Sequence, residues 1–218
     1  MEKAKPKYAI LLVCIITGGF ALVELPTIFI QDVYPDYAIW VKPVIDECSP
    51  DKLLDKRGSL KWFFLCISTK ILGYENLIPY LFSISLIPIT YIFATELTHK
   101  RLVGIITILI LVTSGNFYLF HSVTYEQSWV VFLFLSFYLI LRGRLSASVF
   151  YFLSIISKPL PLLYLPMILF FIIETKTKVK DQIIVFLIVL AICLMFSWSG
   201  SQVITGGGEI EVNKEEFE

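Results

Sequence analysis

The sequence predicts an all-α membrane protein with about seven transmembrane helices and an external first loop that carries interfacial helices. Of its 218 residues, 57% are hydrophobic and 17% are charged, whereas soluble domains have about 45–50% apolar and about 25% charged residues. The mean hydropathy is +0.79, and several apolar runs are long enough to cross a bilayer core of about 30 Å. This composition excludes a soluble enzyme, a disordered tail and a disulfide-stabilised miniprotein.

Charge and cysteine content exclude two further classes. The chain has 18 basic and 18 acidic residues, so it lacks the basic footprint of a nucleic-acid-binding protein. Its four cysteines include no Cys-x-x-Cys pair, and it has only two histidines, so no Cys/His metal site is predicted. Cys48 and Cys66 fall in one predicted external segment, where a disulfide is permitted but not required.

Apolar runs separated by charged residues and prolines give the order of the predicted helices. Residues 9–30 are too long a run for a signal peptide and lack a small-residue cleavage site, so they form a retained span. Residues 59–72 are short and amphipathic, which is typical of a helix lying in the membrane interface. The spans form one membrane module, 1–199, with an external loop at 32–76 and an acidic, flexible external tail at 200–218. The predicted spans are 8–31, 77–97, 102–120, 127–141, 145–157, 160–174 and 182–199.

Residues 145–173 could form one long helix or two short ones. A single helix would contain Lys158 followed by Pro159. Proline removes a helix hydrogen bond, and a lysine in the middle of a bilayer is costly. Two helices that meet at Lys158 avoid both problems. They also place every short basic segment on one side, which puts the N-terminus in the cytoplasm and the tail outside. The basic segments are 1–7, 96–101, 142–144 and 174–181.

Two acids, Asp32 and Asp36, lie where the chain leaves the first predicted span. A carboxylate at this position can act as a general base for a reaction at the outer leaflet, or it can help to hold a divalent cation. The alternative is an ordinary helix end that returns to water. No cofactor is identified from the sequence beyond the compatibility of these acids with a divalent cation.

Three other polar residues on the predicted external side are candidates for substrate binding. Lys158 can neutralise a lipid phosphate as a point charge, or it is a lysine that snorkels from a helix end. His121 and Glu126, in the turn before the fourth span, can bind sugar hydroxyls or phosphate, or they belong to an ordinary polar hairpin. Glu24 lies inside the first span, where an acid should face protein and not lipid.

Several short motifs follow one another in an order known from a family of membrane enzymes. They are Asp-Tyr-Ala-Ile-Trp at 36–40, Lys-Ile-Leu-Gly at 70–73, Tyr-Ile-Phe-Ala-Thr-Glu-Leu at 91–97, the turn at 117–126, and Ser-Lys-Pro at 157–159 with Leu-Pro at 165–166. In these motifs the chain resembles the integral-membrane glycosyltransferases of the GT-C superfamily, especially the protein O-mannosyltransferase and aminoarabinose-transferase branch. The resemblance covers residues 8–199 and implies a minimal seven-span module.

The resemblance implies transfer of a sugar from a polyprenyl-phosphate donor to an acceptor on the external side. Asp36 would be the general base, with Asp32 second; Lys158 would hold the donor phosphate; Glu126 and His121 would shape the pocket. The family's His-Pro-Pro-like element and two of its arginines are replaced here, which favours a second interpretation. In that interpretation the chain is a non-catalytic accessory or scaffold subunit of a larger membrane complex. The expected partners are the lipid bilayer, a polyprenyl-phosphate-linked sugar and, in the second interpretation, another membrane protein.

Overall fold

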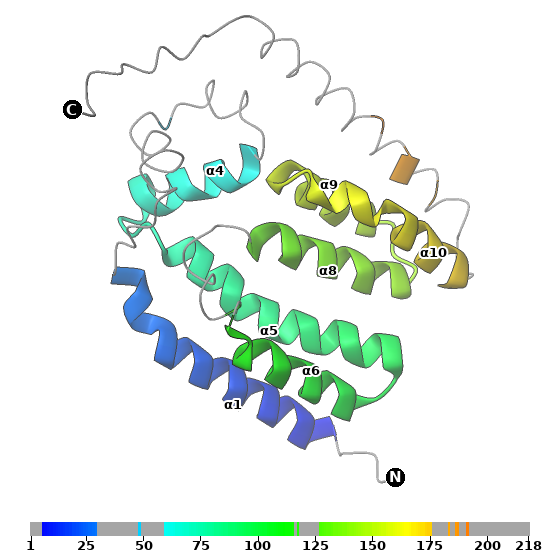
Figure 1. Ribbon diagram of the computed structural model, residues 1–218, viewed down its shortest axis with the longest axis horizontal. Helices are drawn as coiled ribbons and strands as arrows, with labels where there is room; N and C mark the ends of the chain where they lie inside the picture. Colours follow the sequence, from blue (N-terminus) through cyan, green and yellow to red (C-terminus); the bar gives the residue numbers. More distant parts are fainter. Residues whose placement is uncertain are drawn as a thin grey trace, which may run out of the picture.

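The computed structural model describes residues 6–29, 48, 59–115, 117, 127–175, 183, 186, 187 and 191. Every regular element within these ranges is helical, which confirms the predicted all-α class. The α-helices are α1 (Pro6–Glu24), α4 (Ser59–Cys66), α5 (Leu77–Thr98), α6 (Arg101–Thr113), α8 (Gln127–Leu141), α9 (Ala147–Ser157) and α10 (Leu165–Thr175) (Figure 1). Shorter elements are the 3-10 helices Leu25–Phe29 and Leu160–Tyr164 and the π-helix Ile67–Ile71.

The helices form a bundle in which α5 and α8 are central. Helices α1 and α6 pack on α5, and α9 and α10 pack on α8 (Figure 1). Consecutive helices alternate in direction, so the bundle has two ends. We call the end with the α5–α6 and α8–α9 turns the basic end. We call the opposite end, where α4 lies and α8 begins, the disulfide end.

The structure supports only part of the predicted membrane topology. Two described helices, Lys7–Phe29 and Leu77–Thr98, are long and apolar enough to cross a membrane. The other apolar helices are shorter; α6 has 13 residues and reaches about 20 Å at 1.5 Å per residue, less than a bilayer core. The predicted third span, 102–120, is interrupted, because α6 ends where Ser114 adopts an extended backbone with ψ 122°; Gly115 and Phe117 are helical again, and residues 116 and 118–120 lie outside the described residues. The last predicted span and the tail lie almost entirely outside the described residues.

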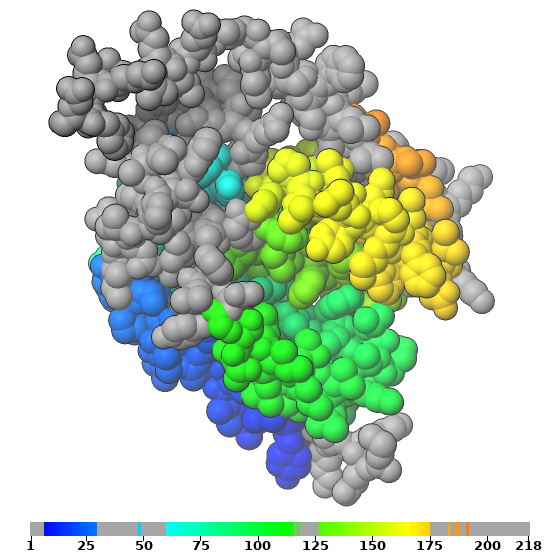
Figure 2. All heavy atoms as spheres, in the orientation of Figure 1, coloured from blue at the N-terminus to red at the C-terminus, as the bar shows by residue number. Residues whose placement is uncertain are grey.

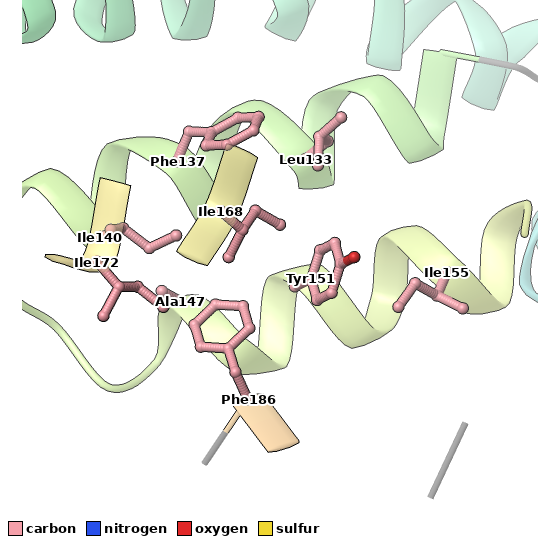
Figure 3. Packing of buried hydrophobic residues seen from close by; sticks show 9 residues of the cluster. All are labelled: Leu133, Phe137, Ile140, Ala147, Tyr151, Ile155, Ile168, Ile172 and Phe186. Carbon is pink, nitrogen blue, oxygen red and sulfur yellow. The ribbon is translucent and has the colours of Figure 1, made fainter. Parts of the chain in front are cut away.

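The predicted helix break at Lys158 is confirmed. Helix α9 ends at Ser157, and Pro159 starts the 3-10 turn that leads into α10. On the two sides of this break, α9 and α10 share a core with α8 (Figure 3). The buried members of this core are Leu133, Phe137, Ile140, Ala147, Tyr151, Ile155, Ile168, Ile172 and Phe186.

A second, smaller core joins α1, α5 and α6 through Val13, Ile87 and Ile108. Gly104 lets α6 approach α5 closely. A Cβ atom at this position would overlap the hydroxyl of Thr95 and would lie 2.8 Å from a ring carbon of Tyr91.

Large apolar side chains cover much of the outside of the bundle. Helices α1 and α6 lie beside each other on the face seen in Figure 2. An extended apolar surface of this kind requires lipid or another apolar surface to cover it. The exposed apolar residues on these two helices include Ile10, Leu11, Ile15, Leu22, Val23, Leu102, Ile106, Leu109 and Ile110.

Candidate functional site

Lys158 occupies a fixed position at the disulfide end. Its backbone is extended (φ −158°, ψ 138°), and its N–H donates to the carbonyl of Ser154 at 3.1 Å. The side chain is half-buried. Pro159 has no N–H to continue the helix, so the chain turns directly after the lysine.

Two hydrogen bonds hold the polypeptide on either side of Lys158. The buried hydroxyl of Tyr151 donates to the carbonyl of Pro161 at 3.0 Å, across the helix break. The hydroxyl of Ser154 donates to the carbonyl of Trp129 at 2.7 Å, which ties the end of α9 to the first turn of α8. The lysine is therefore presented from a rigid corner, as a charged binding residue requires.

A shallow hollow lies at the same end of the bundle, between α4, α5 and α8. Its polar lining is Gln127 and Ser128, both buried at the start of α8, with Lys61 at its edge. Phe64 and Phe82 form its apolar wall, with ring centroids 5.0 Å apart. The space among these side chains does not admit a water molecule, so they form a packed polar and aromatic junction and not a ligand pocket.

A disulfide joins Cys48 to Cys66 at the end of α4, with a Cα–Cα distance of 5.7 Å. The sequence permitted this disulfide but did not require it. Disulfides persist in oxidising compartments and are rare in the cytosol. The disulfide end is therefore the end suited to the external side.

The buried acid Glu24 lies where α1 changes into a 3-10 helix, and it is 3% exposed. This confirms the expectation that Glu24 faces protein. The hydroxyl of Tyr80 donates to the carbonyl of Ala21 at 2.6 Å. The amide of Asn76 donates to the carbonyl of Thr27 at 3.2 Å. These contacts fix the end of α1 against the start of α5, so Glu24 belongs to the junction between the two helices.

Of the five predicted site residues, the structure describes Lys158 alone. Asp32, Asp36, His121 and Glu126 lie outside the described residues. Sequence reasoning did not identify the packing of Lys61 against Phe64 and the start of α8 at this end. The available signal was its three-residue spacing from Phe64 in the amphipathic segment, which places both on one helix face.

No group of three or more His, Cys, Asp or Glu side chains gathers as a metal site within the described ranges. Comparison of the chain with protein-family models, curated proteins and solved structures finds no match.

Proposed function

We propose that this chain is a multi-pass membrane protein with its N-terminus in the cytoplasm and its disulfide end outside. Two observations support this orientation independently. The Cys48–Cys66 bond suits an oxidising compartment, and the turns at the opposite end carry lysines and arginines, as cytoplasmic turns do. The exposed apolar faces of α1 and α6 would then contact lipid.

We further propose a GT-C-like activity, the transfer of a sugar from a polyprenyl-phosphate donor to an acceptor at the external side. The observation that carries this proposal is the helix break that fixes half-buried Lys158 at the disulfide end. A cation there can stabilise the phosphate that leaves when the sugar is transferred.

The proposed reaction needs one base and one phosphate-binding cation. The acceptor oxygen attacks the anomeric carbon of the sugar, and the bond from that carbon to the phosphate oxygen breaks. Asp36, with Asp32 second, takes the acceptor proton. Lys158 neutralises the departing lipid phosphate, and His121 and Glu126 line the pocket. These roles rest on the resemblance in sequence motifs.

Native mass spectrometry of gently extracted protein tests the donor site. The wild type should retain a polyprenyl-phosphate species, and Lys158→Ala should lose it, whereas Lys158→Arg keeps the charge and should retain it. Lys70→Ala is the matched control, because Lys70 is an exposed lysine at the same end. Equal lipid loss in Lys158→Ala and Lys70→Ala would contradict a phosphate site at Lys158.

Asp36→Asn tests catalysis separately. The variant should retain the donor lipid but form no glycosylated product, because the amide cannot accept the proton. Unchanged product formation by Asp36→Asn and by Lys158→Ala, in protein that still inserts, would refute the transferase.

The alternative function is a non-catalytic GT-C-like subunit of a larger membrane complex. The shortness of α6 and its exposed apolar face favour it, because a helix of about 20 Å that is open along one side can pack against the helices of a partner. A stoichiometric protein partner, found with bulk lipid and no polyprenyl phosphate, would support this alternative.

A further inference from the structure

We propose that the basic end of the bundle binds the headgroups of anionic phospholipids. This inference rests on the proposed membrane embedding and is independent of the transferase chemistry at the disulfide end. Exposed bases gather here from three helix ends. They are Lys7, Lys100, Arg101, Arg142 and Arg144. The acids at this end within the described ranges are Glu96 and Glu174, so positive charge dominates.

An ion pair holds the two basic turns together. The guanidinium of Arg142 contacts both carboxylate oxygens of Glu96, at 2.9 and 3.0 Å, and lies over the ring of Tyr138. Bidentate pairs of this kind fix orientation as well as charge. Because Glu96 is near the end of α5 and Arg142 follows α8, the turn with Lys100 is fixed beside the turn with Arg144.

Each of the two turns contains a residue with a left-handed backbone conformation. His99 has φ 55° and ends α5 in the left-handed conformation, and Gly143 has φ 64°. Short turns of fixed conformation keep Lys100 and Arg144 close to the helix ends, where they cannot extend far from the bundle. The positive charge is thus concentrated in a narrow band.

Exposed leucines border the charges and indicate a lipid as the partner. Leu97 and Leu102 flank the first turn, and Leu145 follows the second; they are 42%, 55% and 42% exposed. An RNA or an acidic protein would leave these side chains in water. A lipid surface accepts both features at once, since leucine enters the acyl region while lysine and arginine meet the phosphates.

The test compares retention of phosphatidylglycerol and phosphatidylcholine by the full chain, using native mass spectrometry from mixed micelles. The wild type should prefer phosphatidylglycerol. Lys100→Gln with Arg144→Gln should weaken this preference about fivefold per removed charge, and about 25-fold together. The matched control, Lys100→Arg with Arg144→Lys, changes the same positions but keeps the charge, so it should retain the wild-type preference.

Salt gives a second readout. The preference should fall between 0.1 and 1 M salt, since the Debye length shortens from about 10 to about 3 Å. Equal retention of both lipids by the wild type, or equal loss in both double variants, would overturn the proposal. If the chain proves inactive as a transferase, the expected lipid preference stays the same. If the chain does not float with vesicles, the proposed membrane embedding itself is contradicted.

Discussion

The close approach of α6 to α5 at Gly104 gives the sharpest test of the packing. Replacement of Gly104 by alanine adds a Cβ that overlaps the hydroxyl of Thr95 and lies 2.8 Å from the ring of Tyr91. Overpacking of this kind destabilises a core by about 1–3 kcal/mol. The aromatic ring and the β-branched side chain are both fixed in the helix interface, so we expect the upper half of that range.

A second substitution should reverse part of the loss. The hydroxyl of Thr95 has no hydrogen-bond partner in the part of the chain that the structure describes, so Thr95→Ala alone should change stability little. In combination with Gly104→Ala it removes the worst overlap and leaves the contact with Tyr91. The double variant should therefore recover most, but not all, of the lost stability.

Gly19→Ala is the matched control. Gly19 also lies inside a helix, but a Cβ there meets nothing within 4 Å. Alanine is favoured over glycine in a helix interior by about 1 kcal/mol, so this variant should be as stable as the wild type or more stable. Thermal unfolding in detergent, followed by tryptophan fluorescence, measures the stability of the wild type and of the four variants. If Gly104→Ala unfolds at the same temperature as Gly19→Ala, the two helices are not in close contact at this point.

Three other predictions follow from single contacts. A double-mutant cycle on Glu96 and Arg142 should give a coupling of about 0.5–1 kcal/mol, the upper range for an exposed pair, and additive effects would show that the pair is not formed. Tyr80→Phe should lower stability by about 1 kcal/mol through loss of its hydrogen bond to α1, and an unchanged unfolding temperature would refute that bond. Reduction of the Cys48–Cys66 disulfide should lower stability by about 3 kcal/mol, as expected for a loop of 18 residues. Mass spectrometry after alkylation without reductant checks the bond, since labelling at Cys48 and Cys66 would show that it is absent.

The sequence was sufficient to predict features that depend on the chemistry of a single residue. Pro159 cannot continue α9, so the break at Lys158 could be predicted without knowledge of any neighbour. Glu24 is an acid within an apolar run, and its burial follows from the free-energy cost of exposing it to lipid. Both features depend on intrinsic chemistry, and the structure contains both.

Hydropathy did not predict the features that depend on tertiary contacts or on local backbone geometry. The apolar residues at 117–120 extended the predicted third span to residue 120, whereas α6 ends at Thr113, directly before the Ser-Gly-Asn sequence at 114–116. The hollow beside Lys61 brings together side chains from three helices that are far apart in the chain. The hydrophobic periodicity of a single helix does not predict which side chains of other helices it contacts. It therefore predicted neither this group of side chains nor the close approach of Gly104 to α5.

The lengths of the helices place Lys158 at a definite depth. The ion pair between Glu96 and Arg142 sets the ends of α5 and α8 level with each other at the basic end. From that level α5 runs back from Glu96 to Leu77 over about 28 Å, and α8 runs back from Arg142 to Trp129 over about 20 Å, at 1.5 Å per residue. The hydrogen bond from Ser154 to Trp129 aligns the end of α9 with the start of α8.

Lys158 follows Ser154 by four residues, which adds about 6 Å toward the disulfide end, so it lies within about 3 Å of the level where α5 begins. If α5 spans the bilayer, this lysine lies near the boundary of the apolar core at the disulfide end and not in its middle. At that boundary a half-buried lysine can reach water with its own side chain, as a snorkelling lysine does. Lipid phosphates lie at the same level, so the depth of Lys158 fits the proposed phosphate site as well as a snorkelling lysine, and the comparison of Lys158→Ala with Lys70→Ala distinguishes the two.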